Sequence, residues 1–186
     1  YYYDAAGRLI KQESDVHTPG SAATLAISEF AYDVRGNLIE TTADDGDGDI
    51  LTTAYTYDAL GNPLTMTTGG ATVTMEYDHF GNLTRRMDAM YQSASAQDKP
   101  KHPEQFHYDA AGALTGKTDR NGNVTGYVYD DAGRILSETV RDKQNNVIGS
   151  VSYTYTKTGL KRTESNDTMS ATYAYDELGR LTKAQE

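Results

Sequence analysis

Carboxylates are the side chains of this chain that could do chemistry, and many of them recur at one fixed place. The 186 residues include 27 Asp and Glu. Seven aspartates directly follow a tyrosine and stand three residues before a glycine: Asp4, Asp33, Asp58, Asp78, Asp109, Asp130 and Asp176. A catalytic acid or base works from one pocket, whereas Asp-x-x-Gly repeated along a chain is turn chemistry. We therefore assign these carboxylates to turns and predict that the chain is not an enzyme.

An acidic run between Asp44 and Asp49 is the one group that could bind an ion. Asp45, Asp47 and Asp49 stand at alternate positions with glycines between them, and oxygen ligands on such a loop suit Ca²⁺. The run lacks the Gly and Glu that an EF-hand places at its sixth and twelfth positions. The alternative is a solvated acidic loop without an ion. Calcium is therefore the one cofactor that the sequence suggests, and it predicts no other.

Other site chemistry finds little support. The chain has no Cys, which excludes disulfides, thiolate zinc sites and Cys nucleophiles. His17, His79, His102 and His107 lie in different segments without metal-ligand spacing, so we interpret them as loop or surface residues. A net charge of −10 and a pI near 4.8 disfavour nucleic acid and anionic membranes as partners. A mean hydropathy of −0.67 without a long apolar run argues against membrane insertion.

The Tyr-Asp pairs define an internal repeat that accounts for most of the 15 tyrosines. Each of eight copies has Gly four residues after Tyr, and in the degenerate copy at Tyr155 a threonine replaces Asp. A second large apolar residue stands two positions before each motif tyrosine, as Tyr127 does before Tyr129. The predicted structural residues are Tyr3, Asp4, Gly7, Tyr32, Asp33, Gly36, Tyr57, Asp58, Gly61, Tyr77, Asp78, Gly81, Tyr108, Asp109, Gly112, Tyr129, Asp130, Gly133, Tyr155, Gly159, Tyr175, Asp176 and Gly179.

Each copy is typical of a β-hairpin. The residues before the motif Asp alternate with a period of two and are rich in Tyr, Thr and Val, which favours strands with both aromatics on one face. Asp-x-x-Gly then turns the chain, and Leu or Ile follows Gly by two positions in six copies. Pro63 and Leu160 disturb that spacing, so we expect a bulge or altered register in their hairpins. Further turns are indicated at Gly69-Gly70, Arg120 to Asn123, Asn145-Asn146 and Asn166-Asp167.

The sequence thus predicts an all-β chain of tandem antiparallel hairpins forming a continuous curved strip. Residues 1–186 would be a single array of about eight hairpin units, or roughly 16 short strands. Insertions are expected near residues 14–24, 42–50 and 88–104. The absence of an initiating Met and of a signal peptide suggests a mature product or an excised segment.

The motif Tyr-Asp-x-x-Gly-Arg/Asn-Leu resembles the YD repeat of the Rhs family, and the resemblance extends over residues 1–186. That family includes bacterial polymorphic toxins, C subunits of insecticidal toxin complexes, wall-associated proteins and teneurins. It implies a β-strip that is part of a shell or open spiral, a secreted or bacterial cell-surface location, and a scaffold role around a toxin or effector domain. The self-cleavage of the family's core segment does not carry over, because its Asp-Pro-x-Gly signature is missing.

The rows of tyrosines leave two interpretations open. Packing against neighbouring rings and leucines is favoured by their fixed spacing. The alternative is a carbohydrate-binding or adhesive surface, because tyrosines can stack on sugar rings. The partners predicted are therefore the remaining repeats or toxin domain of a larger parent chain, a second copy paired through exposed sheet edges, or a glycan.

Overall fold

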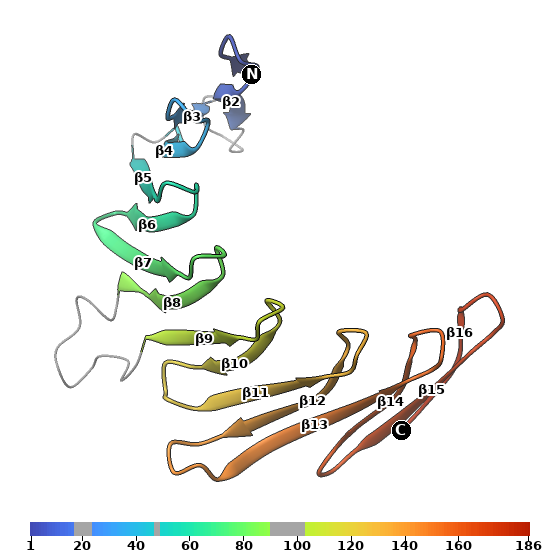
Figure 1. Ribbon diagram of the computed structural model, residues 1–186. Helices are drawn as coiled ribbons and strands as arrows, with labels where there is room; N and C mark the ends of the chain where they lie inside the picture. Colours follow the sequence, from blue (N-terminus) through green and yellow to red (C-terminus); the bar gives the residue numbers. More distant parts are fainter. Residues whose placement is uncertain (17–23, 47–48, 90–102) are drawn as a thin grey trace. The chain divides into compact units, whose positions relative to one another are not determined.

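The fold consists of β-strands that pair in sequence order. The computed structural model describes residues 1–16, 24–46, 49–89 and 103–186, and every element with defined bounds there is a strand (Figure 1). The chain divides into two compact units, residues 1–99 and 100–186. The first unit contains β1 (Tyr2–Tyr3), β2 (Leu9–Val16), β3 (Thr24–Tyr32), β4 (Leu38–Asp44), β5 (Ile50–Tyr57), β6 (Pro63–Thr68), β7 (Ala71–Tyr77) and β8 (Leu83–Met87).

The second unit repeats the same plan. It contains β9 (Glu104–Tyr108), β10 (Leu114–Thr118), β11 (Val124–Tyr129), β12 (Ile135–Arg141), β13 (Val147–Tyr155), β14 (Lys161–Asn166), β15 (Ser170–Tyr175) and β16 (Leu181–Gln185). Its motif turns, after β9, β11, β13 and β15, follow one another along one edge (Figure 1). Within each unit the pairing is antiparallel throughout. The prediction of an all-β fold of tandem antiparallel hairpins is confirmed.

One turn geometry closes every motif hairpin. In the first copy the Asp4 N–H donates to the Arg8 carbonyl at 2.9 Å, and the Gly7 N–H donates to the Asp4 carbonyl at 3.0 Å. Gly7 has a φ of +78°, in the left-handed region where a Cβ would clash. All eight motif turns share both backbone hydrogen bonds, with glycine φ between 76° and 95°. The arrangement is a turn followed by a left-handed glycine, a common hairpin loop.

Every motif hairpin also contains a one-residue bulge. Tyr129 faces Ile135 and Val128 faces Ser137, which leaves Leu136 without a cross-strand partner. The bulges expected for the hairpins of Pro63 and Leu160 are present, but they are not particular to those hairpins. The same shift occurs at the other six because it belongs to the turn geometry and not to the residue at the leucine position.

The segment from Ser14 to Thr24 is partly strand. β2 continues through Ser14, which faces Ala26, and ends at Val16, whose backbone pairs with Thr24. Residues 17–23 lie outside the described residues, as do residues 90–102 of the third expected insertion.

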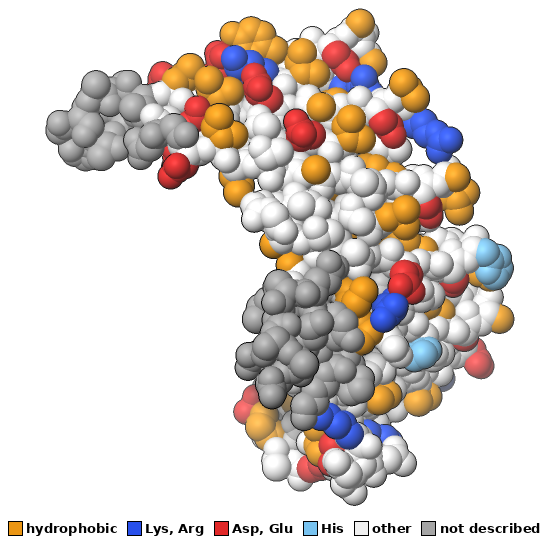
Figure 2. Space-filling model, turned by 90° about the vertical axis from the view of Figure 1, so that its left-hand side faces the viewer, with side chains coloured by type: hydrophobic (Ala, Val, Ile, Leu, Met, Phe, Trp, Pro, Cys, Tyr) orange, Lys and Arg blue, Asp and Glu red, His pale blue; other side chains and the backbone are white. Residues whose placement is uncertain are grey.

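Each unit is one sheet thick, and this limits its burial. Among the described residues no tyrosine, leucine, isoleucine or valine side chain is fully buried. Tyr127, Tyr129, Tyr153 and Tyr155 are half-buried, and the residues between them along each strand are exposed. Hydrophobic side chains accordingly reach the surface among polar ones (Figure 2). Stability must therefore come from contacts between adjacent strands, because the described strands of each unit form a single layer.

A glycine substitution tests the turn. Gly133→Ala places a Cβ at a φ of +76° with no atom within 4 Å, so only backbone strain should act. We expect it to lower the free energy of unfolding by about 1–2 kcal/mol in urea titrations. Gly126→Ala, in β11 at an ordinary φ and equally uncrowded, is the control and should change stability by less than about 0.5 kcal/mol. Equal effects of the two substitutions would contradict the role assigned to the turn.

Candidate functional site

The motif aspartates are engaged inside their own turns. One carboxylate oxygen of Asp130 accepts the backbone N–H groups of Ala132 and Arg134, both at 2.9 Å, and the other accepts the Arg134 Nε–H at 2.7 Å. These hydrogen bonds, first among them the one from the Arg134 side chain, hold the pKa of the Asp130 carboxyl below its usual value. Both oxygens are therefore committed to the turn, which argues against catalytic use of this carboxylate.

The same pattern recurs with asparagine in place of arginine. Asp33 accepts the backbone N–H groups of Arg35 and Asn37, and the Asn37 side chain donates to its second oxygen at 2.9 Å. The Asn37 side-chain bond is the largest cause of the lowered pKa of the Asp33 carboxyl. The residue after the motif glycine is thus part of the turn, which explains why Arg and Asn are frequent there.

Two further turns use this chemistry at the opposite ends of the hairpins. Asp119 accepts the Asn123 backbone N–H at 2.9 Å and its side chain at 3.0 Å, and Asp142 does the same for Asn146. In the second turn Asn145 takes the left-handed position with a φ of 66°. The sequence indicated turns here but not the role of these two aspartates. The sequence signal for this role is an Asp three residues before the residue with left-handed φ, together with an Asn directly after that left-handed residue.

Four motif tyrosines, Tyr32, Tyr57, Tyr129 and Tyr155, join their hairpin to the one before it. The Tyr155 hydroxyl donates to the Ile135 carbonyl at 2.7 Å, and the Arg134 guanidinium lies 4.7 Å from the centre of the Tyr155 ring. Tyr32 makes the equivalent contacts with the Leu9 carbonyl and with Arg8. The hydroxyls of Tyr57 and Tyr129 also bond the carbonyl at the start of the preceding return strand. These rings and hydroxyls are used in packing, which is one of the two interpretations left open by the sequence.

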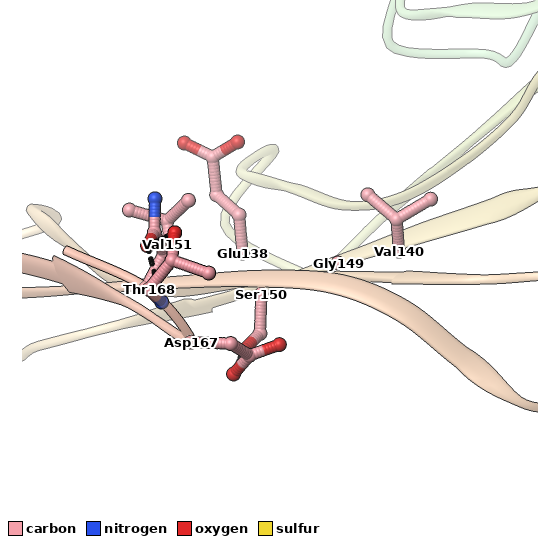
Figure 3. Close-up of a pocket in the computed structure, with 8 residues that line it drawn as sticks. Glu138, Val140, Gly149, Ser150, Val151, Asp167 and Thr168 are labelled. Carbon is pink, nitrogen blue, oxygen red and sulfur yellow. Dashed lines mark hydrogen bonds between the residues drawn. The ribbon is translucent and has the colours of Figure 1, made fainter.

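A trough in the second unit was not anticipated from the sequence. It encloses about 330 Å³ beside β12, β13 and the loop after β14. Glu138, Val140, Val151 and Thr168 stand on one side of the strands, whereas Ser150 and Asp167 point to the other side (Figure 3). It therefore combines apolar walls with one carboxylate on the trough side.

The acidic run is only partly described. The Asp44 side chain accepts the Gly46 N–H at 2.8 Å, a turn within the loop. Asp47 lies outside the described residues, so a calcium site at Asp45, Asp47 and Asp49 stays a prediction. Over residues 1–16, 24–46, 49–89 and 103–186, no three His, Cys, Asp or Glu residues are grouped so as to hold a metal ion.

The two histidines that the structure describes, His79 and His107, lie in different hairpins. His79 lies in a motif turn with its ring 3.7 Å from that of Phe80. His107 is exposed in β9 between the half-buried Phe106 and Tyr108, and His17 and His102 lie outside the described residues. The described residues also include no helix with the length and apolar character needed to cross a membrane.

Known proteins share both the motif and the fold. Residues 1–134 match the teneurin YD-shell family. The chain belongs to that family. The YD-shell segment is 28% identical to the tRNA3(Ser)-specific nuclease WapA of Bacillus spizizenii, over 96% of this chain and 8% of WapA.

Two solved structures show the same fold as this YD-shell segment. The crystal structure of TcdB2-TccC3-Cdc42 aligns with a TM-score of 0.68 and 19% identity, over 98% of this chain and 12% of that one. The Tc holotoxin pore of Photorhabdus luminescens aligns with a TM-score of 0.67 and 19% identity, over 96% of this chain and 11% of that one. The YD-shell segment therefore spans about a tenth of the length of the proteins it matches. The family resemblance stated from the motifs is confirmed.

The tyrosine hydroxyl contact can be tested by removing one oxygen atom. Tyr129→Phe eliminates the hydrogen bond to the Leu114 carbonyl while keeping the half-buried ring. We expect a loss of about 1 kcal/mol in the free energy of unfolding, measured by urea denaturation. Tyr173→Phe is the matched control, because within the described residues the Tyr173 hydroxyl has no hydrogen bond. A Tyr129→Phe variant as stable as the control would argue against this contact.

Acid should weaken the fold through the turn carboxylates. The pKa of Asp130 is lowered in the folded chain, and an unfolded Asp has a pKa of about 3.9. Its contribution is therefore complete above about pH 4 and is lost as the pH falls further, through the folded pKa. We expect the urea concentration at the unfolding midpoint to decrease when the pH is lowered below about 4. Asp130→Asn should reduce this decrease, whereas Asp131→Asn in the same turn should not. An unchanged pH profile for Asp130→Asn would refute this role of the carboxylate.

Proposed function

We propose that this chain is a non-enzymatic wall segment of a larger YD shell that encloses or displays a toxin or effector domain of the same protein. The observation that carries the proposal is that the carboxylates and hydroxyls of the repeat are engaged in hydrogen bonds that hold the sheet together. The carboxylates of Asp33 and Asp130 are engaged in their turns, and the hydroxyls of Tyr32 and Tyr155 bond the preceding hairpin. The polar groups of such a repeat therefore have a structural role. Each added hairpin extends the sheet without forming a hydrophobic core.

The relatives support a segment with partners elsewhere in a longer protein. The chain matches only 8% of WapA, so the nuclease activity in that protein's name need not reside in the matched part. Of the structures with the same fold, one is named for TcdB2, TccC3 and Cdc42 together and the other for a Tc holotoxin pore. On this basis we propose that the remaining repeats and an effector domain are the partners of this segment, and that it acts outside the producing cell or on its surface.

Two measurements test the proposal. The purified 186-residue chain, incubated with tRNA with and without divalent cations, should release no cleavage products, and cleavage that follows the chain through purification would refute the non-enzymatic role. In the longer protein, limited proteolysis should leave the strip and the domain it encloses intact. Gly133→Ala in that protein should accelerate digestion of the enclosed domain, with Gly126→Ala as the control. Digestion of that domain at the same rate in both variants would refute enclosure by this wall.

A further inference from the structure

Lysine, an aromatic ring and a carboxylate form a recurring cluster on the strands. The Lys161 ammonium lies 4.7 Å from the centre of the Tyr153 ring and 2.9 Å from Glu164 Oε2. The ring supplies a negative face and the carboxylate a full charge, so the ammonium is held by both. Two other clusters of this composition are Lys11 with Tyr2 and Glu13, and Lys117 with Phe106 and Glu104.

One hairpin earlier the ring and the carboxylate are present but the lysine is not. Tyr155 faces Lys161 and Tyr153 faces Glu164 across the β13–β14 pair. The equivalent pairs between β11 and β12 are Tyr129 with Ile135 and Tyr127 with Glu138. Glu138 therefore occupies the position of Glu164, whereas Ile135 is the usual Leu or Ile of the repeat at the position that Lys161 takes in the degenerate copy.

Glu138 differs from Glu164 in its pairing. Within the described part of the chain it forms no ion pair, and it accepts one long hydrogen bond, from the Tyr153 hydroxyl at 3.3 Å. The carboxylate is half-buried and lies beside Tyr127, directly across the strand pair. A half-buried carboxylate against an aromatic ring and without a counter-charge favours binding of a cation.

The trough beside Glu138 has the shape and lining for an aliphatic chain. Val140 faces Gly149, and Glu138 faces Val151, across the β12–β13 pair. Val140 and Val151 rise on the same side as the Glu138 carboxylate, with Gly149 between them (Figure 3). Gly149 lacks a positive φ, and a Cβ there would meet nothing within 4 Å. Neither backbone strain nor crowding requires glycine at this position, and its effect is to keep the floor of the trough open.

We propose that this trough binds the side chain of a lysine from another polypeptide segment. The ammonium would pair with the Glu138 carboxylate, and the methylene stem would lie over Gly149 between Val140 and Val151. Lysine combines a compact charge with an apolar stem, which matches one carboxylate at the side of an apolar trough. The clusters that place a carboxylate beside an aromatic on these strands also use lysine. The inference stands on this geometry and does not depend on the proposed wall function.

The binding test compares a charged and an uncharged lysine. The isotope-labelled chain is titrated with Nα-acetyl-lysine methylamide and with its Nε-acetylated form, and amide shifts are followed by NMR. We expect shifts at Glu138, Gly149 and Val151 and an affinity at least about tenfold higher for the charged form. Equal binding of the two forms, or shifts elsewhere only, would overturn the proposal. If butylamine binds with the same affinity as the lysine derivative, the trough is a site for small amines, and the proposal that its ligand comes from a polypeptide is overturned.

Three variants test the assignment of residues. Glu138→Gln should weaken binding of the charged derivative at least about tenfold, whereas the matched control Glu164→Gln should not, because that carboxylate is already paired with Lys161. Ile135→Lys should supply an ammonium from within the chain, as Lys161 does beside Glu164, and compete with the derivative for Glu138. Gly149→Val should block the trough without changing charge. Unchanged binding in folded Glu138→Gln and Ile135→Lys variants would overturn the proposal even if Gly149→Val fails to fold.

Discussion

The hydrogen-bonded aspartate of the motif turn is the interaction on which the rest of this fold depends. In one five-residue loop, Asp130 fixes two backbone N–H groups and the Arg134 side chain. The loop sets the bulge that follows it, and the bulge sets the register in which Tyr129 faces Ile135. Because the turn and the register are fixed, the Arg134 guanidinium is held 4.7 Å from the centre of the Tyr155 ring in the next hairpin. The turn therefore determines contacts between hairpins as well as within them.

A sheet of one layer depends on these lateral contacts more than a packed domain would. Tyr155 bonds the carbonyl at the start of β12 and lies under Arg134, which is also bound to its own turn. The chain of contacts runs from turn to side chain to the ring of the next hairpin, so each hairpin is stabilised mainly by its neighbours. Such a strip can be extended by adding hairpins, because no central core has to be completed. This property suits a segment that matches only about a tenth of much longer proteins.

The sequence predicted what local chemistry determines. Asp-x-x-Gly, alternation and the aromatic pairs predict hairpins and the shared face of Tyr127 and Tyr129, and these follow from the backbone preferences of a few residues. The universal bulge was not predictable from Pro63 or Leu160, since it arises from the loop and not from those residues. Asp119 and Asp142 were missed because no tyrosine precedes them. The trough could not be foreseen because it depends on which residue of β13 faces Val140.

Positions that differ between the hairpins are therefore more informative about function than the positions that repeat. A residue that matches its equivalents in other hairpins is explained by packing, as Tyr155 is by its bond to the Ile135 carbonyl. Ile135 keeps the Leu or Ile of the repeat and Lys161 departs from it, so Glu164 has a lysine beside it whereas Glu138, among the described residues, has none. Together with Gly149 this difference leaves a negative charge beside an open apolar trough on an otherwise regular strip. A surface built of nearly identical units can acquire a specific contact in this way, because side chains on the strands can differ between hairpins without altering the turns that hold the sheet.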